Sequence, residues 1–131
     1  MKRPKGNILT TALQLATEHR ERDDLDHTLV AVIFKGKRVV SFGHNDLASR
    51  KKLLPEFQKW HGSIHAEVMA INKAKRDLNG FEMIVLRVNK DGDFRMARPC
   101  KHCWRYIKYA GIKGAHYSIG DPENIVYERT P

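Results

Sequence analysis

The stretch Thr28–Phe34, with the sequence TLVAVIF, decides the fold, because nearly all of its residues are apolar and several are β-branched. A strand with one solvent-facing side would alternate with polar residues, so we expect this one to be buried on both faces. Lys35-Gly36-Lys37 follows as a tight turn, and Arg38–Gly43 returns as the hairpin partner. The sheet therefore starts with an antiparallel pair.

Further strands and helices alternate along the rest of the chain. The predicted strands are Phe81–Val88, Phe94–Ala97, Gly114–Ile119 and Ile125–Arg129, and the predicted helices start at Asn7 (as cap), cover Ile64–Leu78 and run from Pro99 to Gly111. This alternation predicts an α/β sandwich with one mixed sheet. A chain of 131 residues fits a single domain, residues 1–131.

The end of the chain limits the topology of the sheet. Only about five residues separate Ile119 from Ile125. A parallel neighbour would need a crossover of roughly a dozen residues or more. We therefore expect the last strand, Ile125–Arg129, to run antiparallel to the strand before it.

Composition places the chain among ordinary globular proteins with an excess of positive charge. No apolar run approaches the roughly 20 residues of a membrane span, and the basic N-terminus leads into an amphipathic segment, so we expect a cytoplasmic protein without a membrane partner. Lysine and arginine total 24 against 15 acidic residues, giving a net charge of +9. This excess serves solubility or attracts a phosphate-bearing partner, and composition alone does not separate the two.

The chemistry is concentrated in two short segments, His65-Ala66-Glu67 and Pro99-Cys100-Lys101-His102-Cys103. Cys100 and Cys103 are the only cysteines, which is too few for a disulfide scaffold. Three residues apart on a helix, both thiols lie on one face. A helix N-terminus also favours the thiolate form that binds metal.

One imidazole and two thiolates form a three-ligand zinc site with an open fourth position, as in catalytic zinc sites. Glu67 lies two residues beyond His65 and would reach that position as a proton acceptor and donor. Two other interpretations stay open: a redox dithiol, and a structural zinc site with His102, His61 or His44 as fourth ligand.

The paired motifs, H-A-E followed by P-C-x-x-C, resemble the signature of the cytidine deaminase superfamily. The first hairpin with Gly43-His44-Asn45 is also similar to the family, and Cys103 to Tyr117 most resembles its deoxycytidylate (dCMP) deaminase branch. The resemblance implies a three-layer α/β/α sandwich around a mixed sheet of about five strands, a bound Zn²⁺ and a homo-oligomer. The antiparallel ending departs from that branch and resembles free cytidine deaminases.

The resemblance also implies a role for individual residues. Asn45 would bind the sugar, the backbone amide of Ala66 would bind the pyrimidine carbonyl, and the backbone carbonyl of Arg98 would accept from the exocyclic amine. Glu67 would protonate N3 of cytosine and then the departing ammonia. Tyr117 would flank the nucleotide, although simple packing in the core accounts for it equally well.

Basic residues near both motifs bear on the substrate. They are Arg50, Lys51 and Lys52 before the first motif and Arg95, Arg98, Lys101 and Arg105 around the second. If these residues surround the mouth of the pocket, they would bind a phosphate group. They therefore favour a small-molecule nucleotide as substrate, dCMP above all. The alternatives are cytosine in single-stranded DNA or RNA, with Phe57 and Trp60 stacking on bases, free cytidine or deoxycytidine, and a nucleic-acid-binding module with a structural zinc.

Overall fold

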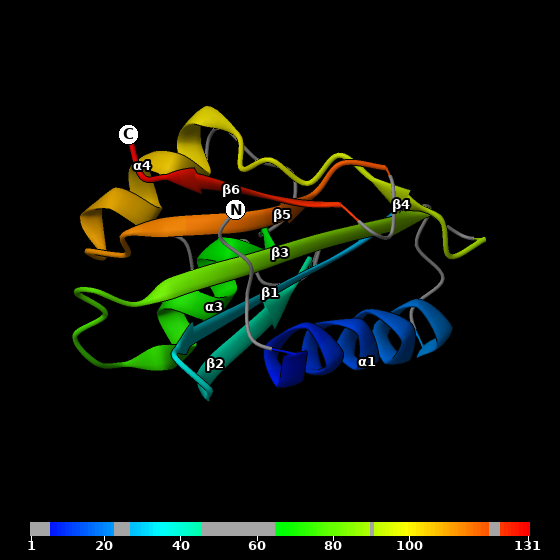
Figure 1. Cartoon of the computed structure of the whole chain (residues 1–131), viewed down its shortest axis with the longest axis horizontal. Helices are drawn as coiled ribbons and strands as arrows, with labels where there is room; N and C mark the ends of the chain where they lie inside the picture. Colours follow the sequence, from blue (N-terminus) through cyan, green and yellow to red (C-terminus); the bar gives the residue numbers. More distant parts are fainter. Residues whose placement is uncertain (1–5, 23–26, 46–64, 90, 121–123) are drawn as a thin grey trace.

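The computed structural model describes residues 6–22, 27–45, 65–89, 91–120 and 124–131. Its elements are α1 (Gly6–Arg22), β1 (His27–Lys35), β2 (Arg38–His44), α3 (Ala66–Ala74), β3 (Glu82–Asn89), β4 (Phe94–Arg95), α4 (Lys101–Tyr109), β5 (Gly114–Ser118) and β6 (Ile125–Arg129). The strands form one six-stranded mixed sheet in the order β2-β1-β3-β5-β6, with the short β4 paired to β3 (Figure 1). The predicted mixed α/β sheet is confirmed; it has six strands instead of about five, and β4 is shorter than the predicted strand Phe94–Ala97.

The central strands are buried on both faces, as their continuous apolar runs predict. Side chains alternate across a strand, so Ala31 and Ile33 of β1 join the core under α3 and α4. Val30 and Val32 join a second core under α1. The sheet therefore separates two helical layers, which gives the three-layer sandwich.

The helix α1 covers one face with a narrow apolar stripe. Its fully buried contacts come from Ile8, Ala12 and Ala16, which recur at helical spacing. Asn7 does not cap this helix as predicted: it lies within α1 and its side chain donates to the carbonyl of Lys37, 2.8 Å away. Across the described residues, no helix combines the length and apolarity that crossing a membrane requires.

The two predicted hairpins are confirmed. β1 pairs antiparallel with β2 across the turn at Gly36, and β5 pairs antiparallel with β6. β3 and β5 pair in parallel, which makes the sheet mixed. Ligand sites in such sheets lie beyond the carboxyl ends of the parallel strands. We therefore expect the active site beyond the carboxyl ends of β3 and β5.

The helix α3 is shorter than predicted. It ends at Ala74 because Lys75 adopts a left-handed backbone conformation, with φ of 48°. The chain then turns so that Leu78 enters the core from outside the helix. The apolar spacing that extended the predicted helix to Leu78 therefore reflects a core contact made by the following turn.

The helix α3 packs unusually close to β2. The hydroxyl of Ser41 donates to the carbonyl of Ala70 at 2.6 Å. A Cβ added to Gly43 would lie 2.5 Å from the carbonyl oxygen of Ala66 and 2.5 Å from the amide nitrogen of Ala70. Both are backbone atoms, so only glycine fits at this position. The contact places the first turn of α3 directly over the end of β2.

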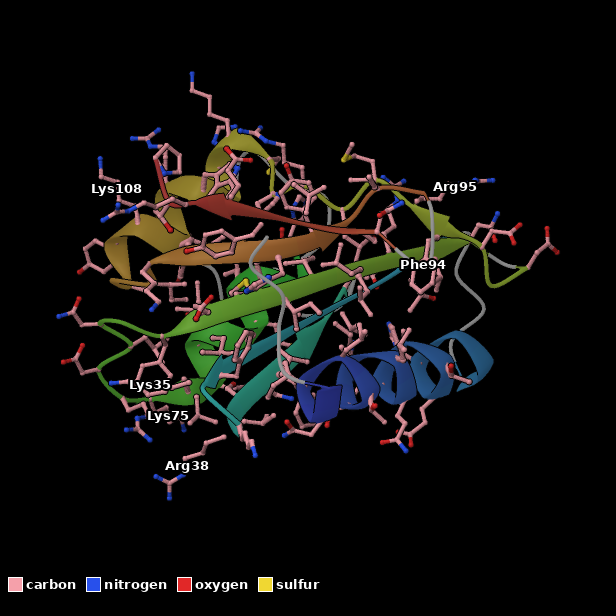
Figure 2. All side chains as sticks on the ribbon, in the orientation of Figure 1. Lys35, Arg38, Lys75, Phe94, Arg95 and Lys108 are labelled. Carbon is pink, nitrogen blue, oxygen red and sulfur yellow. The ribbon has the colours of Figure 1, made fainter. Side chains whose placement is uncertain are left out.

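Positive charges lie at both ends of the sheet. Figure 2 shows Lys35, Arg38 and Lys75 gathered at one end, whereas Arg95 projects from the opposite end. Lys35 and Arg38 face each other at the β1–β2 turn. Arg95 pairs across the sheet with Arg87 of β3, at the end where β2 finishes. Only this second group lies near the two motifs.

Candidate metal centre and active site

The metal-ligand residues lie at the beginnings of two neighbouring helices. His65 is the N-cap residue of α3, and Cys100 is the N-cap residue of α4. Cys103 follows within the first turn of α4 and is fully buried. The positive end of a helix dipole favours a thiolate. Both helices that carry ligands were predicted, but they begin at Ala66 and Lys101, later than the predicted starts at Ile64 and Pro99.

The three ligand atoms converge although 35 or more residues separate His65 from the cysteines. His65 Nδ1 lies 3.1 Å from Cys103 Sγ and 3.8 Å from Cys100 Sγ. All three atoms lie within 4.8 Å of one another. A set of one nitrogen and two sulfurs suits tetrahedral zinc, with a fourth position left for water or substrate. His65, Cys100 and Cys103 are thus positioned to bind a metal.

Charge is unevenly distributed over these three side chains. A hydrogen bond from Cys103, together with His65, lowers the pKa of the Cys100 thiol from 9.0 to about 3, against the opposing effect of burial. The same hydrogen bond and burial raise the pKa of Cys103. These opposite shifts favour the thiolate at Cys100 and the thiol at Cys103, and a bound metal ion would displace the proton of that thiol.

Removing the metal should lower the thermal stability of the protein. A ligand at one hundred times its dissociation constant adds about 2.7 kcal/mol to folding, which is roughly 10 °C in Tm for a domain of this size. We expect dialysis against a chelator to lower Tm by this order and zinc, but not magnesium, to restore it. A Cys103→Ser variant should show little response to zinc. Unchanged Tm in a sample shown to be metal-free would contradict this expectation.

Glu67 lies in the first turn of α3 and is only 2% exposed. Burial raises the pKa of its carboxyl, while the neighbouring His65 acts in the opposite direction. One carboxylate oxygen, Oε1, is buried and has no hydrogen-bond partner within the described part of the chain. A buried acceptor without a donor is costly. It fits a site whose missing donor arrives with a bound water or substrate.

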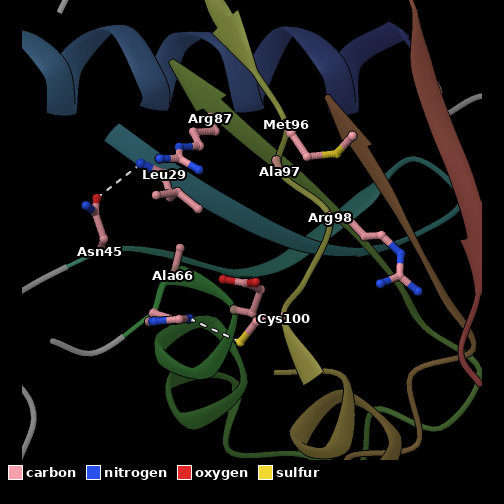
Figure 3. Close-up of a pocket in the computed structure, with 10 residues that line it drawn as sticks. Leu29, Asn45, Ala66, Arg87, Met96, Ala97, Arg98 and Cys100 are labelled. Carbon is pink, nitrogen blue, oxygen red and sulfur yellow. Dashed lines mark hydrogen bonds between the residues drawn. The ribbon is translucent and has the colours of Figure 1, made fainter. Parts of the chain in front are cut away.

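A cavity of about 280 Å³ opens beside these residues (Figure 3). Its walls include His65, Ala66, Glu67 and Cys100 from the two motifs. Asn45 and Arg98, both predicted to contact the substrate, also line it; the other lining residues are Leu29, Arg87, Met96 and Ala97, which the sequence analysis did not single out. Of the predicted site residues, only Cys103 and Tyr117 are not among the described residues that line the cavity, and Cys103 still joins His65 and Cys100 in the metal-ligand group.

The side chain of Asn45 is fixed by its neighbours. Its Oδ1 accepts from the backbone N–H of Leu29 at 3.1 Å and lies 3.2 Å from Nε2 of His19. The ring of His19 in turn contacts the ring of His44, with centroids 4.1 Å apart. The amide of Asn45 is therefore held in one orientation at the edge of the cavity.

Tyr117 packs in the core instead of flanking the cavity. It is 7% exposed, belongs to the core under α3 and α4, and donates from its hydroxyl to Glu128 at 3.1 Å. Glu128 also binds the guanidinium of Arg98 through both carboxylate oxygens, each at 2.7 Å. Of the two explanations for Tyr117, packing is the one that this placement fits. Its link to the cavity is indirect, through Glu128 and Arg98.

The alternative fourth ligands do not join the three metal-binding residues. Neither His44 nor His102 belongs to the group of converging ligand atoms in the described structure. Nδ1 of His44 instead lies 3.2 Å from the carbonyl of Asn45. His61 lies outside the described residues, as do the basic residues Arg50, Lys51 and Lys52 and the aromatic residues Phe57 and Trp60.

The chain is similar in sequence to one protein family and in fold to several solved structures. The family model described as the cytidine and deoxycytidylate deaminase zinc-binding region matches residues 3–119. A crystal structure of dCMP deaminase from the cyanophage S-TIM5, in complex with dCMP and dUMP, is similar at a TM-score of 0.55 and 19% identity, covering 88% of this chain and 83% of that one. Cytidine deaminase from Burkholderia pseudomallei is similar at 0.58 and 16%, covering 92% and 91%. No curated protein sequence matched significantly.

Proposed function

The chain belongs to the cytidine and deoxycytidylate deaminase family, and on that basis we propose that it hydrolytically deaminates a cytosine nucleotide, with dCMP as the preferred substrate and dUMP and ammonia as products. The observation that carries this proposal is the buried carboxylate of Glu67. It has an oxygen without a partner and lines the same cavity as His65 and Cys100. A proton carrier beside a metal site is the arrangement that hydrolytic deamination needs.

Each side chain of the centre has a distinct task in this reaction. His65, Cys100 and Cys103 would hold zinc, which lowers the pKa of a bound water so that it is nucleophilic at neutral pH. Glu67 accepts a proton from the water as the new C4–O bond forms, and it delivers that proton to N3 of the ring. It then accepts the remaining proton of the attacking oxygen and transfers it to the amine, so that the C4–N4 bond breaks, the C4 carbonyl forms and ammonia is released.

Three further groups would position the base and the sugar. The N–H of Ala66 belongs to the first turn of α3, where backbone donors have no partner within the helix. It would bind the pyrimidine carbonyl. The backbone carbonyl of Arg98 would accept from the exocyclic amine, and the oriented amide of Asn45 would bind the sugar. All three residues line the cavity.

Single-stranded nucleic acid is a second candidate substrate, and the charge of the chain favours it. The net charge is +9, and the exposed Lys101 and Arg105 lie on the helix that carries the cysteines. A polymer would contact many phosphates, so its binding would weaken steeply as salt rises. A mononucleotide would show a shallower dependence, because it carries a single phosphate group.

A substrate panel separates these candidates. The zinc-loaded protein is incubated with dCMP, CMP, deoxycytidine, cytidine and a single-stranded DNA oligonucleotide, and ammonia release is measured for each. We expect the highest kcat/KM for dCMP. Turnover of the oligonucleotide with none of dCMP would replace the first candidate with the second, and equal turnover of dCMP and deoxycytidine would remove the preference for a nucleotide.

A further inference from the structure

Arg87 is a charged residue in an otherwise apolar strand. It lies in β3, whose residues Met83 and Val85 face the core under α3 and α4. Because side chains alternate along a strand, Arg87 continues the same face. At this point the core gives way to the cavity, and Arg87 is one of the residues that line it. Its side chain therefore lies on the same side of the sheet as the metal centre.

No acidic side chain in the described part of the chain compensates the charge of Arg87. Its Nε is buried and has no hydrogen-bond partner among the residues that the structure describes, and the residue as a whole is only partly accessible. No carboxylate in the described ranges forms an ion pair with it, whereas the guanidinium of Arg98 is bound by both oxygens of Glu128. A cation withdrawn from water is costly unless an anion accompanies it. Two arginines thus line one cavity, and among the described residues only Arg98 is paired with a carboxylate.

The surroundings of Arg87 place it next to the predicted sugar contact. Arg87 pairs across the sheet with Leu29, and the N–H of Leu29 binds the amide of Asn45. Figure 3 shows Arg87 beside Leu29 on the side of the cavity that faces Ala66 and Cys100. A cytosine nucleotide carries its reacting amine at one end and its phosphate at the other, with the sugar between. Along the cavity, the metal centre would meet the amine, Asn45 the sugar and Arg87 the phosphate.

The cross-strand neighbour of Arg87 adds to the positive potential. Arg87 lies directly opposite Arg95 of β4, which is exposed. Like charges at such positions destabilise a sheet, so the pair is unfavourable in the protein alone. A bound dianion would relieve this repulsion.

From these placements we infer that Arg87 binds the phosphate of the substrate and makes the site select a nucleotide over its nucleoside. This inference rests on the proposed function and adds the residue that determines the substrate class. A guanidinium presents two parallel N–H donors that match two phosphate oxygens, which an ammonium group does not. The bond is made equally in the ground and transition states, so its loss should raise KM more than it lowers kcat.

The test compares Arg87→Gln, Arg87→Lys and the matched control Arg38→Gln, which removes the same charge at the opposite end of the sheet (Figure 2). We expect Arg87→Gln to lower kcat/KM for dCMP about 100-fold, the scale of a charge-assisted bidentate contact. Its kcat/KM for deoxycytidine should stay within about threefold of wild type. Arg87→Lys should show a smaller loss on dCMP only, and Arg38→Gln should match wild type.

Equal losses on dCMP and deoxycytidine in the Arg87 variants would overturn the inference and leave the proposed function standing. If Arg87→Gln does not fold, the same comparison with Arg87→Lys decides. Calorimetric titration with dUMP and deoxyuridine gives a readout that needs no turnover: wild type should bind dUMP more tightly, and Arg87→Gln should bind both alike. The same variants are also assayed on the single-stranded DNA oligonucleotide. This comparison shows whether Arg87 binds the phosphate of a mononucleotide or that of a polymer. If no cytosine compound is deaminated, the proposed function fails, and the titration alone decides on Arg87.

Discussion

Replacing Glu67 by glutamine should lower kcat by about 100-fold or more while leaving the zinc content unchanged. General acid–base catalysis contributes a factor of this size, and the amide of glutamine has the shape of the carboxylate without its ability to carry a proton. Glu67 is not one of the three converging ligand residues, so metal binding should survive. The measurement is a steady-state assay of dCMP deamination alongside metal analysis of the same sample.

The control for this variant is Glu82→Gln. Glu82 is a second glutamate that is withdrawn from solvent, though only partly, and it lies at the far end of β3, where it contacts His116 at 2.9 Å. Its substitution should leave kcat within about twofold of wild type. Full activity of Glu67→Gln would refute the proton-carrier role. Loss of zinc from Glu67→Gln would instead mean that the residue supports the metal.

Replacing Gly43 by alanine should destabilise the protein by about 3 kcal/mol or more, the upper range for a side chain forced into a packed interior. The new Cβ would lie 2.5 Å from backbone atoms of Ala66 and Ala70. Neither atom can rotate away, so α3 must shift as a whole. For a domain of this size we expect Tm to fall by roughly 10 °C in a thermal melt.

The displacement of α3 should also reach the metal centre. Ala66 and its neighbour His65 begin the helix that Gly43 supports, so zinc affinity should fall together with Tm. The control is Gly6→Ala, because a Cβ at Gly6 meets nothing within 4 Å. A Gly43→Ala protein with wild-type Tm would show that β2 and α3 adjust freely, against the close packing described above.

The metal centre was predictable because its signals are local. His65 and Glu67 are two residues apart, Cys100 and Cys103 are three apart, and each pair begins a helix that the apolar spacing also indicates. Short-range patterns of this kind can be recognised without knowing how the rest of the chain is arranged. The hairpin ending was predictable for a similar reason, because about five residues cannot form a crossover.

Other features depend on distant pairings that no short pattern contains. The bond between Arg98 and Glu128 joins residues 30 positions apart, and it needs β6 to lie beside the segment before α4. Arg87 gave a signal, a cation inside the apolar run of β3, but its meaning requires the register with Leu29. The end of α3 was missed because Leu78 fits helical spacing while it reaches the core through a turn.

The origin of the ligands on two separate helices has a kinetic consequence. His65 belongs to α3, whereas Cys100 and Cys103 belong to α4, and only the metal would join all three covalently. Complete release of the ion then requires its bonds to both helix ends to break, so we expect the release rate to rise when either helix end is loosened. The rate at which an excess of a chromophoric chelator takes up the ion would measure this release. Variants that loosen α3 should increase that rate.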